Sequence, residues 1–118
     1  MSQDNFFPHV GVWVHEYLLE SVNRKVNDRD TFWCASWWKH TEAVERLTAL
    51  WITWEQARNE PETFSAWWRD HLDHHLPILM SSTGPFRYCL RGEHKADKYA
   101  EDKFPMKPFP DGLFDFLS

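Results

Sequence analysis

The chain has 118 residues, a formal net charge of −5 at pH 7 and an aromatic content of 17%, with eight tryptophans. This length indicates one domain with enough buried surface for a single core without disulfide staples. The acidic charge and the absence of any Lys/Arg run longer than two argue against a duplex-DNA-binding protein.

The first helix is expected from Val10 to about Val26. On a helical wheel its apolar residues fall in one half, and Glu16 and Glu20 fall in the other. A turn signal, NDRD, follows at residues 27–30. The next segment, 31–40, is short and rich in rings. We expect it to be an irregular connector whose rings fill the core.

Residues 42–58 show the clearest helical pattern, with an apolar arc that includes Leu47, Leu50 and Trp54. A third helix is expected to begin near Thr63 or Ser65. It carries the motif WWRDHLDHHL at residues 67–76. Pro77 follows, and proline predicts that this helix kinks or stops there. Beyond it, residues 86–104 suggest one more short, charged helix.

These elements predict an all-α fold, with three main helices around a tryptophan-rich core. Residues 1–90 form the helical domain in this interpretation. Residues 91–118 form a C-terminal extension, with a charged segment followed by a tail rich in proline and phenylalanine. Three prolines in the first half of the tail make it irregular.

The third helix also raises the question of a metal. On the wheel, His71 and His75 fall inside the apolar sector, and their i,i+4 spacing places both imidazoles on one face, as a metal ion requires. Zinc takes four thiolate or imidazole ligands, and the chain offers Cys34, Cys89 and also His40. The candidate ligands are therefore Cys34, His71, His75 and Cys89, holding one structural zinc.

A reading without metal stays open. Histidines in an aromatic core often bond to backbone carbonyls or to tryptophan N–H groups. There is no CxxC motif, since Cys34 and Cys89 stand far apart in the chain, whereas zinc modules usually show their ligands in close pairs.

No catalytic motif is evident. The chain has no GxSxG and no glycine-rich phosphate loop, and Leu72 follows His71 where a HExxH protease helix needs glutamate. We therefore expect no enzyme. Two alternatives stay open: a zinc-dependent hydrolase or nuclease that uses His71 and His75 with a carboxylate, and an adaptor whose tryptophans stack on single-stranded nucleic acid.

The final segment, DGLFDFLS, alternates acidic and large apolar residues. It is a candidate partner-binding peptide, anchored in a groove of another protein by Leu113, Phe114, Phe116 and Leu117. The alternative is that it folds back over its own core. We favour the second slightly, because free rings at a chain end reduce solubility.

Several stretches together resemble one known family. They are Trp33-Cys34, the WWKH at residues 37–40, the helix at 42–55, the WWRDHLDHH at 67–75 and the GPFRYC at 84–89. From about Phe7 to Cys89 the chain resembles the domain of unknown function 4913 family of actinobacteria and their phages.

That family name carries no activity. The resemblance implies an origin in phages, prophages or conjugative elements, and it implies that Cys34, His71, His75 and Cys89 belong to a shared motif. We therefore expect a non-enzymatic accessory protein that binds a host or element-encoded protein. With no signal segment and no apolar run of membrane-spanning length, its expected location is the cytoplasm of a bacterial host cell, without membrane contact.

Overall fold

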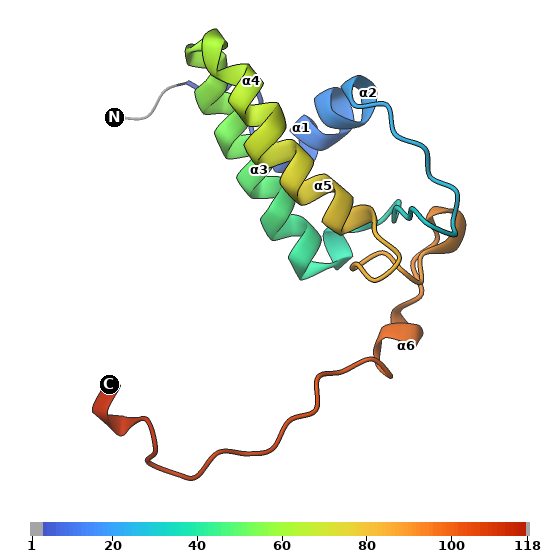
Figure 1. Ribbon diagram of the computed structural model, residues 1–118, viewed down its shortest axis with the longest axis vertical. Coiled ribbons are helices and arrows are strands. Elements are labelled where there is room, and N and C mark those ends of the chain that lie inside the picture. Colours follow the sequence, from blue (N-terminus) through green and yellow to red (C-terminus); the bar gives the residue numbers. More distant parts are fainter. Residues whose placement is uncertain (1–3, 118) are drawn as a thin grey trace.

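Three helical rods form the body of the protein in the computed structural model, which describes residues 4–117 (Figure 1). The first rod joins α1 (Val10–Trp13), a π-helical turn (Val14–Leu18) and α2 (Leu19–Ser21). The second rod is α3 (Thr41–Asn59). The third rod joins a 3-10 turn (Pro61–Thr63), α4 (Phe64–Ala66), a π-helical turn (Trp67–Leu72) and α5 (Asp73–Met80). A short α6 (Ala96–Tyr99) follows. Residues 4–117 contain no β-strand, so the all-α prediction is confirmed.

The first rod is shorter than expected. Helical structure ends at Ser21, and Val22 is already extended, with φ −100° and ψ 105°. The side chain of Asn27 accepts hydrogen bonds from the backbone N–H groups of Arg29, Asp30 and Thr31. Such local side-chain bonds compete with helix formation. The prediction of a helix to Val26 was therefore wrong by five residues.

The third rod does not stop at Pro77, which was one of the two outcomes expected there. Pro77 lies inside α5, which continues to Met80. The ring is on the exposed side of the helix, where water can satisfy the carbonyl that loses its partner. Its neighbours Leu76 and Leu79 are buried in the core, and this packing holds the last turn in place.

Tryptophan rings join the rods into one core. The ring of Trp13 in α1 lies 6.3 Å from those of Trp54 in α3 and Trp67 in the third rod, centroid to centroid. Phe7 adds a tilted ring contact to Trp54 at 5.5 Å. Aromatic pairs of this kind each contribute about 0.5–1.5 kcal/mol beyond the surface they bury. The predicted tryptophan-rich core is thus present. Separately, none of the helices in residues 4–117 is long and apolar enough to cross a membrane.

A buried carboxylate fastens the N-terminal segment to α3. The side chain of Glu55 is 6% exposed and accepts hydrogen bonds from the backbone N–H groups of Phe6 and Phe7, both at 2.9 Å. It also accepts hydrogen bonds from Trp51 Nε1 and Arg58 Nε, both at 3.1 Å. Burial alone raises the pKa of Glu55, but these four hydrogen bonds together outweigh it and hold the pKa below its usual 4.5.

We expect Glu55→Gln to destabilise the protein by about 2 kcal/mol at pH 7, because hydrogen bonds to a charged acceptor are worth more than those to an amide. Because the pKa of Glu55 is lower in the folded than in the unfolded chain, the ionised carboxylate stabilises the fold at pH values above the unfolded pKa. This stabilisation is lost as the pH falls below about 4.5. Urea unfolding from pH 7 to pH 3 should therefore show a shallower pH dependence for the variant than for the wild type. Equal slopes would contradict this role.

Gly84 allows the loop after α5 to turn. A Cβ atom at this position would lie 2.3 Å from the backbone oxygen of Ile78 and 3.0 Å from that of Leu79. Backbone atoms cannot move aside as the end of a flexible side chain can. We expect Gly84→Ala to cost about 3 kcal/mol by overpacking, measured by thermal unfolding. Gly11→Ala, whose Cβ would meet only the side chain of His9 at 3.1 Å, is the control with a smaller effect.

Candidate metal centre

Four potential metal ligands meet where two loops cross at one end of the rods. Cys34 lies in the 31–40 connector and His40 immediately precedes α3, while Cys89 and His94 flank the 3-10 turn Leu90–Gly92. The loops are held together by a 2.8 Å hydrogen bond from Ala35 N to Gly92 O. Gly92 has φ +77°, a left-handed conformation that favours glycine.

The ligand atoms of these residues converge on one point. Cys34 Sγ lies 3.6 Å from His94 Nδ1, and Cys89 Sγ lies 3.5 Å from His40 Nε2. The two imidazole nitrogens, His94 Nδ1 and His40 Nε2, are 3.1 Å apart. All four atoms lie within 4.8 Å of one another. One metal ion would be within reach of all of them.

The surroundings set the protonation states of two ligands. Burial, followed by the nearby His94 and Arg87, lowers the pKa of His40 to about 4, so its ring is neutral at pH 7 and has a lone pair to give. Burial, then hydrogen bonding with Cys89, raises the pKa of Cys34 to about 11. A metal that binds here therefore has to displace a proton from Cys34.

Tyr99 supports the centre from α6. Its hydroxyl lies 3.3 Å from Cys89 Sγ and accepts a hydrogen bond from the backbone N–H of Tyr88 at 3.0 Å. Its ring packs edge-on against His40 at 5.3 Å and carries the guanidinium of Arg87 on its face at 4.9 Å. With Cys89 as a thiolate, the hydroxyl is oriented to donate to the sulfur, as outer groups commonly do at metal ligands.

The structure brings together only half of the ligand set expected from sequence. Cys34 and Cys89, both fully buried, are members of the cluster. His71 and His75 are not: both are half-buried on the third rod. The ring of His75 faces Arg46, with 2.9 Å between Nδ1 and the guanidinium, and His71 lines a small cavity beside Trp67.

The helical wheel failed at these histidines because the rod is not a regular α-helix. Residues Trp67–Leu72 form a π-helical turn, in which each residue advances by a smaller angle than the 100° the wheel assumes. The faces beyond the turn are therefore rotated relative to those before it, and the two rings lie at the margin of the core.

Sequence reasoning missed His94 and named His40 only as an additional ligand. The charged residues around His94 suggested a solvated extension. A signal was nevertheless present: Cys34 is followed by His40 and Cys89 by His94, so that two Cys–His pairs are close in sequence. Searching for CxxC alone overlooks pairs of this mixed kind.

The tail residues do not lie over the core. Leu113, Phe114, Phe116 and Leu117 are 49%, 48%, 79% and 71% exposed. Figure 1 shows the chain after α6 running away from the rods to its C-terminal end. The favoured expectation that this tail folds back on its own core was therefore wrong.

Comparison with known protein families gives a match over most of the chain. The sequence profile of the domain of unknown function (DUF4913) matches residues 7–110, which continue past Cys89 and include His94 and Tyr99. No curated protein and no solved structure matches the chain. Since the matched residues make up most of its length, the chain belongs to the DUF4913 family.

Proposed function

We propose that the protein is a non-enzymatic binding module of a phage or mobile element, in which one structural zinc secures the crossing loops and the exposed tail contacts a partner protein. The phage or mobile-element setting is what the resemblance to the DUF4913 family implies. The zinc and the tail are each argued below from the geometry.

The ligand spacing supports zinc. Zinc bonds of about 2.3 Å to sulfur and 2.0–2.1 Å to nitrogen, in a tetrahedron, place sulfur and nitrogen about 3.6 Å apart and two nitrogens about 3.3 Å apart. The corresponding distances are 3.5 and 3.6 Å between sulfur and nitrogen, and 3.1 Å between the nitrogens. Two cysteines and two histidines are also a common ligand set for structural zinc.

The same geometry favours a structural role over hydrolysis. A catalytic zinc keeps one position open for water, whereas four protein ligands fill a tetrahedral site. Binding here would join the 31–40 connector, the start of α3 and the segment that leads to α6. Its mechanical effect is to hold the residues that precede the tail against the rods.

The observation that carries the binding role is the exposure of the tail. Residues 104–117 expose seven large apolar side chains: Phe104, Met106, Phe109, Leu113, Phe114, Phe116 and Leu117. Apolar side chains gathered on one segment and left in water mark interaction sites. Phe109 and Phe114 already pack edge to face at 5.1 Å, so part of the segment is ordered before it binds.

The test is capture of a partner by the immobilised full-length protein from an actinobacterial lysate. Capture should fail for Phe114→Ser/Phe116→Ser and persist for Phe104→Ser, which alters a still more exposed ring of the tail outside the terminal segment. Recovery of the same proteins by all three would contradict a binding role for the terminal segment. Native mass spectrometry of the same preparations tests the zinc independently.

A further inference from the structure

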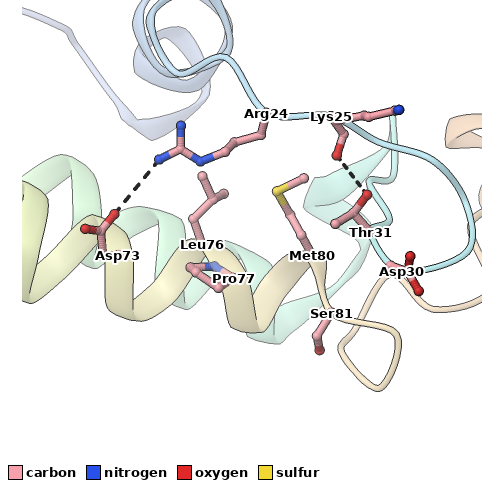
Figure 2. A pocket seen from close by; sticks show the side chains of 9 residues that line it. All are labelled: Arg24, Lys25, Asp30, Thr31, Asp73, Leu76, Pro77, Met80 and Ser81. Atoms are coloured by element: carbon pink, nitrogen blue, oxygen red, sulfur yellow. Dashed lines mark hydrogen bonds and ion pairs between the residues drawn. The ribbon is translucent and has the colours of Figure 1, made fainter.

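An apolar groove runs along α5, on the side facing residues 22–31. One cavity of about 480 Å³ has Leu76, Pro77 and Met80 at its floor and Arg24 and Lys25 at its rim (Figure 2). A second cavity of about 160 Å³ shares Arg24, Leu76 and Met80 with the first and extends the groove towards Leu19 and Val22. We call the two together the α5 groove.

The wall of the groove opposite α5 has free backbone groups. The N–H of Val22 still bonds Leu18 O at 2.9 Å, and residues 23–27 lie outside any helix or strand. The backbone N–H groups of Arg24, Lys25 and Val26 donate to no acceptor among residues 4–117. An extended backbone of this kind beside an apolar floor is the arrangement by which proteins bind short peptides through main-chain hydrogen bonds and side-chain pockets.

The charges at the rim specify the peptide further. Lys25 has no ion pair within the described chain, and the pair between Arg24 and Asp73 is long, at 3.9 Å, and exposed (Figure 2). Asp30, the other acid of the lining, is paired with Arg29 at 3.6 Å. Of the two cations and two acids that line the larger cavity, Lys25 alone has no ion pair within residues 4–117, so the groove suits an acidic peptide with large apolar side chains.

The C-terminal segment of this same chain has that chemistry. Residues 109–117, FPDGLFDFL, carry Asp111 and Asp115 and no cation. A turn at Gly112, with φ +79°, holds the rings of Phe109 and Phe114 together, so less conformational freedom is lost on docking. In the folded chain this segment extends away from the rods (Figure 1).

We propose that the α5 groove binds residues 109–117 of a second copy of this chain, and that two copies exchange their tails reciprocally. Each copy then provides one groove and one tail, which closes the assembly as a two-fold dimer. This inference rests on the proposed function, in which the tail is the binding segment, and names a second copy of the chain as one partner of that segment. The rings enter the apolar floor formed by Leu76 and Met80, while Asp111 and Asp115 lie towards Arg24 and Lys25.

Sedimentation velocity of the full-length protein, from tens to several hundred micromolar, tests the exchange. The wild type should form dimers as its concentration rises. Lys25→Glu and the tail variant Asp111→Lys/Asp115→Lys should each weaken the dimer at least ~10-fold, because each places like charges together. Combining all three substitutions in one chain restores opposite charges and should restore the dimer. Arg69→Glu, with the same charge change on an exposed helix face outside the groove, is the matched control.

Three results would overturn the exchange. The first is a wild-type protein that stays monomeric at every concentration. A tail that docks in the groove of its own chain would also give this result. Another is a dimer unaffected by Phe114→Ser/Phe116→Ser, and the third is a triple variant no better than Lys25→Glu. The proposed function has its own test, since a monomeric wild type that still captures another protein through Phe114 and Phe116 keeps that function and loses only the second copy as partner.

Discussion

Removal of the proposed zinc by a chelator should lower the free energy of unfolding by about 4 kcal/mol, the linkage expected when free metal stands near one thousand times its dissociation constant. For a chain of this size the loss corresponds to a drop in Tm of roughly 15 °C. The rods keep their own core, so the apo protein should retain helical circular dichroism. Hydrogen exchange should instead rise at the crossing loops, notably at the N–H of Ala35 that bonds Gly92.

Substitution of the ligands separates the two candidate ligand sets. We expect His40→Gln and His94→Gln to abolish the single zinc in native mass spectra and to remove most of the response to chelator. His71→Gln/His75→Gln is the matched control, with the same chemical change, and should retain one zinc. Loss of zinc in the control with retention in His94→Gln would overturn the site, as would a wild type that binds no metal at saturating zinc.

The fold was accessible from sequence because it depends on patterns that local chemistry imposes. The apolar arc of residues 42–58 could be satisfied only by packing against other helices, and it became α3. The failures are places where one local preference was countered by another part of the chain. Val22 continued the helical pattern, but the turn fixed by Asn27 ended the helix earlier, and the packing of Leu76 and Leu79 carried α5 through Pro77.

The candidate site was predictable in part for a different reason. Two isolated cysteines in a chain with seven histidines suggest a metal, and Cys34 and Cys89 do meet. Which histidines join them depends on how two loops cross, and no periodicity records that. The wheel could compare residues only within one helix, so it selected His71 and His75 and had no means of placing His94 beside His40.

The tryptophan pair of the third rod provides the largest expected effect outside the metal centre. Trp67 is 2% exposed, and its Nε1 donates to Leu50 O at 3.1 Å and to Thr53 Oγ1 at 3.0 Å. Trp68 beside it is only half-buried. Trp67→Ala should cost about 4 kcal/mol, since it removes a packed ring and leaves a cavity where the third rod meets the first two. Trp68→Ala should cost about 1 kcal/mol.

Urea unfolding, followed by circular dichroism, measures both losses on the same scale. Small domains have total stabilities of about 5–15 kcal/mol, so a loss of about 4 kcal/mol is a large part of the total. Trp67→Ala should therefore shift the urea midpoint far more than Trp68→Ala does. Trp67→Phe should fall between them, because it keeps an apolar ring but loses the N–H donor. If Trp67→Ala and Trp68→Ala shifted the midpoint equally, Trp67 would not be the ring that joins the rods. A larger loss for Trp68→Ala would require the third rod to present its other face to the core, which would also reposition His71 and His75.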